Sequence, residues 1–271
     1  MTGEIQALLD LLSGKSEDIE LDRAALTVAR IEYPELDADE AIALLDHHAF
    51  AIADRAEDLS DGKCFVETAS AYLFTTAGFR ANPEDYYNPA NSCLNRVLQT
   101  GLGIPITLSL VYMEIARRLA KPVSGVGLPG HFVIRYDDGG YQAIIDPFNG
   151  GAILDAAGCC RLAGVESLEP GMLDTVGKRQ VVMRMINNLR AIYFSRREGE
   201  KALAVLDLLI AANPEGADEY KQRGAALLQM RRINEALGAF RRYLELAPNA
   251  PDRERIEEQM RSIAFWIASR N

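Results

Sequence analysis

The last third of the chain repeats itself with a period of 34 residues. Four pairs of similar residues stand 34 positions apart: Ala202 and Ala236, Leu203 and Leu237, Leu206 and Phe240, and Pro214 and Pro248. A period of this length is typical of stacked helix pairs, because each pair buries its apolar face only against the next. The repeat therefore constrains this part of the chain to a small helical solenoid.

The period is that of the tetratricopeptide repeat. In the second copy the aromatic, close-packing and interhelix positions of that motif are filled by Tyr220, Gly224, Ala236, Phe240 and Pro248, and in the first copy Tyr193, Ala202 and Pro214 match. We expect two repeats over residues 184–271, with a last helix that caps the open end. Such arrays offer a concave surface to peptides; the alternative is that two repeats only brace the neighbouring domain.

Helices are also predicted before the repeats. Apolar residues recur at helical spacing on both sides of Pro34, and a short helix through Leu98 has Asn91 or Ser92 as its predicted N-cap. A longer helix is expected to start at Pro105, because proline suits the first helical position. Its sequence, "PITLSLVYMEIARRLA", is apolar on nearly every face, so we expect it to be buried at the centre of the domain.

Three short apolar segments, "VSGVGL", "HFVIRY" and "YQAIID", follow this helix and predict strands. The last two are expected to form a hairpin with residues 137–140 as its loop. If Tyr136 pairs with Tyr141, His131 stands directly opposite Asp146, with Cβ atoms roughly 5 Å apart. The hairpin pattern therefore predicts a hydrogen bond between these two side chains.

A histidine beside an aspartate has two interpretations. The carboxylate can fix the tautomer and orientation of the imidazole, as in the His-Asp half of a nucleophilic triad. Alternatively, the two residues form a polar pair that stabilises the end of the sheet. The Pro129-Gly130 turn before His131 and the Asp146-Pro147 step favour a functional site.

Composition excludes several classes of function. The chain has 39 acidic and 29 basic residues, the acids are concentrated near the N-terminus, and no basic stripe is present, so nucleic-acid binding is disfavoured. No segment has the pattern of a signal peptide or a membrane span, which predicts a cytoplasmic protein that binds no membrane. The cysteines, Cys64, Cys93, Cys159 and Cys160, lack the spacing of a zinc site, and no metal or cofactor is expected.

The middle of the chain resembles the transglutaminase-like fold, which is related to papain-like cysteine proteases. The segments that carry the resemblance are "YYNPANSCLNRVL", "GIPITLSLVYMEIARRL", "GLPGHFVIRY" and "IIDPFNGG". The whole chain resembles the bacterial family that adds tetratricopeptide repeats to this core. The resemblance implies an α+β fold in two parts. Residues 1–183 would form a helical N-terminal region and the core, which contains a central buried helix and a small antiparallel sheet. Residues 184–271 would form an α-helical solenoid.

The resemblance also implies a Cys-His-Asp site. His131 and Asp146 match the second and third members, but the cysteine position at the start of the central helix is occupied by Pro105. Ser109 lies one turn further on the same face, where we expect it to be deeply buried. Cys93 is the candidate thiol upstream of the helix.

Two functions follow from this pattern. The first is a non-catalytic, degenerate member of the family, with His131 and Asp146 as a vestigial dyad. Such a protein would be a protein-binding, scaffold or regulatory protein. It would hold a protein or peptide through the repeats or through the degenerate catalytic cleft. The alternative is a cysteine hydrolase or acyl transferase that uses Cys93 with His131 and Asp146. The absence of a nucleophile at Pro105 favours the first.

Overall fold

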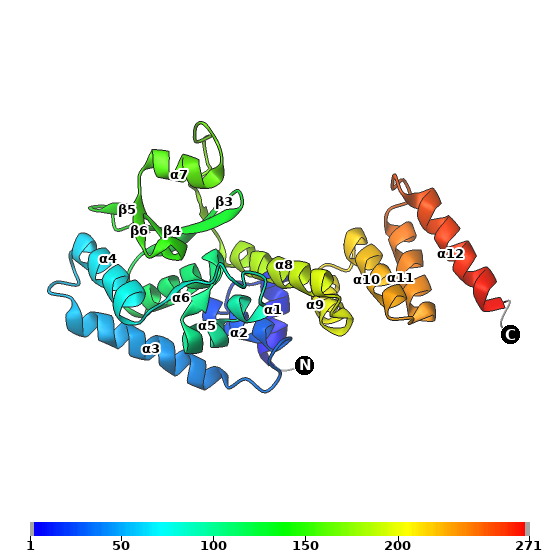
Figure 1. The fold of residues 1–271 in the computed structure, drawn as a ribbon, viewed down its shortest axis with the longest axis horizontal. Coiled ribbons are helices and arrows are strands. Elements are labelled where there is room, and N and C mark those ends of the chain that lie inside the picture. Colours follow the sequence, from blue (N-terminus) through cyan, green and yellow to red (C-terminus); the bar gives the residue numbers. More distant parts are fainter. Residues whose placement is uncertain (1–2, 269–271) are drawn as a thin grey trace. The chain divides into compact units, whose positions relative to one another are not determined.

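The computed structural model describes residues 3–268. The chain divides into two compact units: one is formed by residues 16–188 with the chain up to Leu11, and the other by residues 12–15 with the chain from Leu189 onward. A sheet with surrounding helices forms most of the first unit, and the second consists of helices (Figure 1). The expected α+β class is confirmed.

Seven helices lie along the chain as far as the end of the sheet region. They are α1 (Gly3–Ser13), α2 (Leu21–Ala29), α3 (Ala38–Arg55), α4 (Gly62–Ala71, followed by a π-helical turn over Tyr72–Thr76), α5 (Leu94–Thr100), α6 (Pro105–Arg118) and α7 (Ala156–Ala163). Short 3-10 turns cover Pro89–Ser92 and Pro147–Asn149.

Helix α6 is the centre of the first unit. Every residue from Pro105 to Ala116 is buried, as its apolar pattern predicts. The helix contacts strands β3 (Val123–Leu128) and β4 (His131–Asp137) as well as helices α2, α3 and α5, so it lies between the sheet and these helices (Figure 1). Proline at its first position costs no hydrogen bond, because the first N–H groups of a helix have no partner within it.

The main sheet is antiparallel and has the strand order β6-β5-β4-β3-β7. Its strands are β3 (Val123–Leu128), β4 (His131–Asp137), β5 (Gln142–Asp146), β6 (Ala152–Leu154) and β7 (Thr175–Val176). A separate parallel pair is formed by β1 (Arg80–Ala81) and β2 (Leu102–Gly103). The three strands predicted from the sequence are confirmed as β3, β4 and β5.

The C-terminal helices are α8 (Lys178–Arg196), α9 (Gly199–Ala212), α10 (Ala217–Gln229), α11 (Ile233–Leu246) and α12 (Arg253–Ala268). Gly224 of α10 faces the Phe240 ring of α11 so closely that a Cβ at Gly224 would lie 2.6 Å from a ring carbon. The close-packing glycine expected in the second repeat is thus explained by the approach of these two helices.

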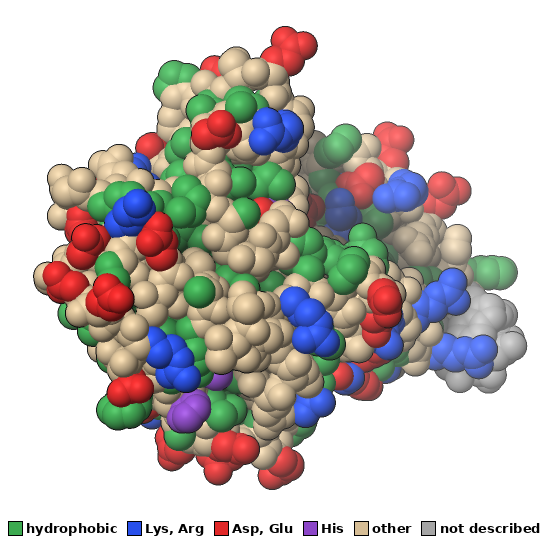
Figure 2. Space-filling model, turned by 60° about the vertical axis from the view of Figure 1, so that its left-hand side comes forward, with side chains coloured by type: hydrophobic (Ala, Val, Ile, Leu, Met, Phe, Trp, Pro, Cys, Tyr) green, Lys and Arg blue, Asp and Glu red, His purple; other side chains and the backbone are tan. Residues whose placement is uncertain are grey.

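Two surface properties bear on the classes of function excluded above. No helix among residues 3–268 is long and apolar enough to cross a membrane. On the face of the molecule in Figure 2, Lys and Arg side chains lie among Asp and Glu side chains rather than in one continuous stripe. This mixed pattern is typical of a solvated surface rather than one that follows a phosphate backbone.

Candidate site at the end of the sheet

Strand β4 begins at His131, directly after a tight turn. Leu128 of β3 stands opposite His131, so Pro129 and Gly130 form a two-residue turn between the strands. Gly130 has a φ of +68°, a left-handed conformation that residues with a Cβ rarely adopt. The turn therefore fixes His131 at the end of the sheet.

The hairpin between β4 and β5 differs from the prediction. Asp137 pairs with Gln142, so the loop covers residues 138–141 rather than 137–140. The predicted pairing of Tyr136 with Tyr141 is therefore wrong, and the true register is shifted by two residues.

Asp138 is the physical reason for this shift. Its carboxylate accepts the backbone N–H groups of Gly140 and Tyr141 at 2.8 and 2.7 Å, which closes the loop one residue later than expected. His131 and Asp146 are consequently diagonal rather than direct neighbours. Because side chains alternate with a period of two, a shift of two residues leaves both on the same face of the sheet.

His131 and Asp146 are hydrogen-bonded, as predicted. The Nε2 atom of His131 lies 3.0 Å from Oδ1 of Asp146, the carboxylate is fully buried, and the His131 side chain is 11% exposed. When Nε2–H donates to the carboxylate, Nδ1 is the other ring nitrogen and carries the lone pair. The pair can thus orient an imidazole and stabilise its protonated form.

Asp146 is held by more than the histidine. Its Oδ2 accepts the Asn149 side-chain amide at 2.6 Å, and its Oδ1 accepts the backbone N–H groups of Phe148 and Asn149. Burial favours the neutral carboxyl, but the hydrogen bonds from His131 and Asn149 outweigh burial and hold the pKa of Asp146 below its usual value. Asp146 is therefore a fixed carboxylate at neutral pH.

The start of α6 is occupied by a proline rather than by a cysteine. Pro105 is the first residue of the helix and is buried. Two residues later, the Thr107 hydroxyl accepts the Ile104 N–H at 3.1 Å and donates to the Asn91 carbonyl at 2.6 Å. Ser109, one turn beyond Pro105, is fully buried, as expected. The helix terminus is thus occupied by contacts that hold the preceding loop.

Cys93 is placed at the N-cap of α5, where the sequence had suggested Asn91 or Ser92. Its side chain is fully buried. Burial and then the neighbouring Cys93 raise the pKa of Tyr33, which follows α2. The contacts that the structure gives the His131 ring are with Asp146 and with Phe148.

Several residues of this region were not found by sequence reasoning. The Phe148 ring lies 5.7 Å from the His131 ring, and the Tyr86 ring lies 6.3 Å from Phe148. Arg184 of α8 donates to the carbonyl oxygens of Leu128 and His131. Asn149 could have been found from the sequence, because it is a polar residue three positions after Asp146. Arg184 could not, because no pattern in the residues around it points to its contact with the turn before His131.

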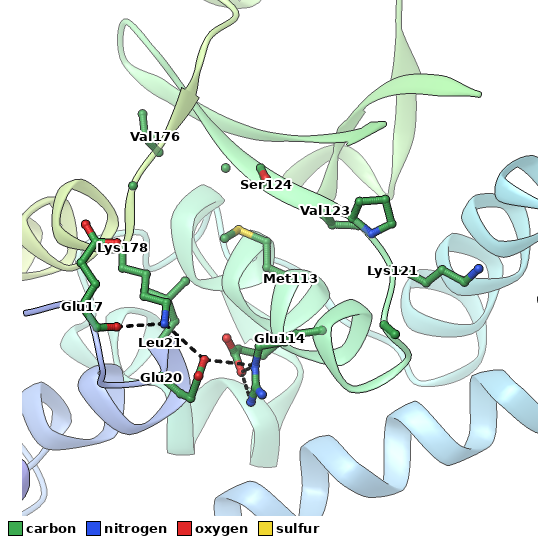
Figure 3. A pocket seen from close by; sticks show the side chains of 15 residues that line it. Glu17, Glu20, Leu21, Met113, Glu114, Lys121, Val123, Ser124, Val176 and Lys178 are labelled. Atoms are coloured by element: carbon green, nitrogen blue, oxygen red, sulfur yellow. Dashed lines mark hydrogen bonds and ion pairs between the residues drawn. The ribbon is translucent and has the colours of Figure 1, made fainter. Parts of the chain in front are cut away.

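A separate cavity of about 510 Å³ lies between the loop before α2, the end of α6 and strand β3 (Figure 3). Lys178 donates to the carbonyl oxygens of Glu17 and Ile19, and Arg117 lies 2.8 Å from the Glu114 carboxylate. Because these charges already have partners within the chain, we do not place the functional site in this cavity.

The remaining histidines and cysteines have structural surroundings. His48 Nδ1 lies 2.9 Å from the Tyr72 hydroxyl oxygen, and its neighbour His47 is exposed. Cys159 and Cys160 lie in α7, where burial raises the pKa of Cys159. Within residues 3–268, no group of three or more His, Cys, Asp or Glu side chains is arranged to hold a metal ion.

Comparison with known proteins identifies both parts of the chain. A family model described as the transglutaminase-like superfamily matches residues 39–187, and one described as a tetratricopeptide repeat matches residues 189–261. A UPF0162 protein of Xylella fastidiosa (strain Temecula1) is 33% identical over 250 residues, which cover 89% of this chain and 88% of that protein. F-box only protein 21 of Homo sapiens is 33% identical over 163 residues, which cover 55% of this chain and 26% of that protein.

A crystal structure of menin aligns with 96% of this chain and 74% of its own, at a TM-score of 0.40 and 11% identity, a similarity too low to carry an argument. The family match, by contrast, spans more than half of the chain and includes α6, His131 and Asp146. The chain therefore belongs to the transglutaminase-like superfamily and carries tetratricopeptide repeats after its core.

Proposed function

We propose that this protein is a non-catalytic binding or scaffold protein built on a degenerate transglutaminase-like core. A core of this family joined to tetratricopeptide repeats suggests a role in protein interaction. The observation that carries the non-catalytic part is Pro105 as the first residue of α6, where the family resemblance places the nucleophilic cysteine. Proline has no nucleophilic atom, and His131 and Asp146 can only move or stabilise a proton.

The dyad has a structural use even without a nucleophile. Asp146 binds His131, the Asn149 amide and two backbone N–H groups, and thereby joins the turn before β4 to the segment after β5. These contacts hold the loops at the end of the sheet in one arrangement. A partner would therefore meet a preorganised surface, which lowers the entropic cost of binding.

The alternative is a cysteine hydrolase or acyl transferase that uses Cys93. Such an enzyme needs a thiolate within hydrogen-bond reach of the imidazole and open to substrate. The complete burial of Cys93 and its N-cap position beside α5 are the reasons to prefer the non-catalytic function. We also propose a cytoplasmic location, which suits thiols such as Cys64 and Cys160.

Activity assays on four forms of the full chain test this proposal. We expect the wild-type protein to show no hydrolysis or transfer with amide, ester and glutamine-peptide substrates. Pro105→Cys restores a thiol at the start of α6 and is expected to raise turnover by several orders of magnitude over the wild type, an effect that His131→Ala added to it should remove. Turnover by the wild type that disappears in Cys93→Ala would overturn the proposal and establish the alternative.

A further inference from the structure

Arg184 clamps the turn that positions His131. Its Nη2 atom donates to the carbonyl oxygens of Leu128 and His131 at 3.1 and 2.7 Å, one on each side of the Pro129-Gly130 turn. Its guanidinium carbon lies 5.5 Å from the centre of the Phe132 ring. Gly127 leaves room for the group, since a Cβ at that position would lie 3.3 Å from Nη1. The guanidinium is thus held in a defined place beside the dyad.

The charge of Arg184 is not neutralised by an acid. Both of its hydrogen bonds are made by Nη2 to carbonyl oxygens, and within residues 3–268 no carboxylate lies within ion-pair distance of it. Burial lowers its pKa, as expected for a half-buried cation without a counter-charge. The Nε and Nη1 groups remain as donors on different edges of the guanidinium, so each can donate a charge-assisted hydrogen bond to a carboxylate on its own.

A row of aromatic rings leads from the dyad to the surface. The ring centres of Phe148 and His131 are 5.7 Å apart, those of Tyr86 and Phe148 are 6.3 Å apart, and those of Tyr87 and Tyr86 are 5.3 Å apart. Tyr87 is 68% exposed and Tyr86 is 37% exposed. Arg184 donates to the carbonyl oxygen of His131, so the row begins at a residue that the guanidinium contacts.

The loop that carries the two tyrosines is fixed by side-chain contacts. Asn91 donates to the carbonyl oxygens of Asp85 and Tyr86 at 2.7 and 3.3 Å. The Asp85 carboxylate accepts the Asn88 amide at 2.8 Å, so this neighbouring acid is engaged within its own loop. The exposed tyrosines therefore stand on a rigid support, as binding surfaces with large aromatic anchors commonly do.

We propose that these five residues, His131, Phe148, Tyr86, Tyr87 and Arg184, form a patch that binds an acidic segment of a partner protein. A glutamate or aspartate side chain would accept from Nη1 or from Nε of Arg184, and apolar side chains next to it would cover Tyr86 and Tyr87. The half-buried cation without a counter-charge selects the carboxylate, and the exposed rings supply contact area. This inference rests on the proposed binding function and names the chemistry of the partner.

Two amidated peptides that differ in one group test the proposal on the full chain. Acetyl-Leu-Glu-Leu-amide and acetyl-Leu-Gln-Leu-amide are titrated while the side-chain resonances of His131, Tyr86 and Arg184 are followed by NMR. We expect both peptides to shift these resonances and the glutamate peptide to bind roughly fivefold more tightly or better. Arg184→Gln should make the two affinities equal, whereas Tyr87→Ala should weaken both peptides and keep their ratio.

Arg179→Gln is the matched control, because Arg179 is an exposed arginine of the same helix and its loss should leave the ratio unchanged. Equal affinities of the two peptides for the wild type would overturn the proposal while leaving peptide binding, and thus the proposed function, intact. No shift at the three resonances with either peptide would overturn the patch itself. Tighter binding of acetyl-Leu-Leu with a free terminal carboxylate would overturn the choice of an acidic side chain.

Arg184→Lys serves as the second variant if Arg184→Gln does not fold. It keeps the positive charge, so the glutamate peptide should still bind more tightly than the glutamine peptide. Equal affinities of the two peptides for this variant would contradict the role of the charge at position 184. Cleavage of either peptide would count against the non-catalytic function, and it would leave the preference for glutamate as a separate result.

Discussion

Two regions of the first unit place an arginine near the protein interior, and they differ in what the arginine meets. At the C-terminal end of α6, Arg118 contacts the carboxylates of Asp22, Asp46 and Glu114 at 2.7, 2.6 and 3.0 Å. At the end of the sheet, Arg184 meets two carbonyl oxygens and an aromatic ring. In the first region carboxylates of the chain neutralise the arginine, and in the second the arginine has no carboxylate partner among residues 3–268.

The pKa directions agree with this difference. Burial disfavours the charge of Asp22, but the hydrogen bond and charge of Arg118 outweigh burial, so the pKa of Asp22 is lowered. For Glu114, burial outweighs Arg117 and Arg118, so its pKa is raised. Burial lowers the pKa of Arg184, which has no carboxylate to oppose it. The charge of Asp22 is thus offset within the fold, whereas the charge of Arg184 is not.

The largest effect on the free energy of unfolding is expected for Arg118→Met. This change leaves the buried carboxylates of Asp22 and Glu114 with Arg117 as their remaining arginine, so we expect the free energy of unfolding to fall by about 3–5 kcal/mol. Urea unfolding of the full chain followed by circular dichroism measures it.

Arg135→Met is the control for this prediction, because Arg135 pairs with Asp137 and both side chains are 32% exposed. Its loss should cost about 1 kcal/mol or less. Equal losses for the two variants would contradict the view that the ion pairs at the end of α6 act mainly in stability.

A smaller effect on the free energy of unfolding is expected for His131→Ala, which removes the hydrogen bond between His131 and Asp146. Asp146 loses one hydrogen bond but keeps those of Asn149 and the backbone, so we expect a loss of about 1–3 kcal/mol at neutral pH. Urea unfolding measures this loss in the same way. The exposed His47 provides the control, because His47→Ala should change the free energy of unfolding by about 0.5 kcal/mol or less.

The effect of His131→Ala should depend on pH. The folded pKa of Asp146 is lowered, so the stability that its partners provide is complete above the unfolded value of about 3.9 and is lost as the pH falls through the folded value. The difference between wild type and variant should therefore shrink below about pH 4. A difference that stays constant from pH 7 to pH 3 would show that the hydrogen bond to the carboxylate is not its source.

Local patterns in the sequence predicted most of the fold. Proline at position 105 and an apolar run on every face were sufficient to place α6, because both signals act within the helix itself. The 34-residue period likewise marked Gly224 as a close-packing position, and the structure places the Phe240 ring against it. The hydrogen bond between His131 and Asp146 was predicted from a direct pairing that is wrong, and it is present because a shift of two residues leaves both side chains on the same face of the sheet.

The sequence did not predict what depends on loop closure and on distant contacts. The hairpin register was wrong because Asp138 caps Gly140 and Tyr141, a choice among turns that strand patterns do not determine. Arg184 was missed because it reaches the turn before His131 from 53 residues further along the chain. It binds carbonyl oxygens, and every residue has a carbonyl oxygen, so no residue type signals the contact.

The smallest effect is expected for Arg184→Met, and it separates the two arginine regions most sharply. The variant loses two hydrogen bonds to the carbonyl oxygens of Leu128 and His131, but it also removes a half-buried charge that has no counter-charge, and the methionine stem can still cover Phe132. These contributions oppose each other, so we expect the free energy of unfolding to change by about 1 kcal/mol or less. Urea unfolding of Arg184→Met and Arg118→Met side by side measures the difference between their free energies of unfolding.

A loss near that of Arg118→Met would mean that Arg184 acts mainly in stability. The distinction between a region whose charges are paired within the chain and a region proposed to bind a ligand would then fail. A small loss would support the view that Arg184 contributes little to the stability of the fold.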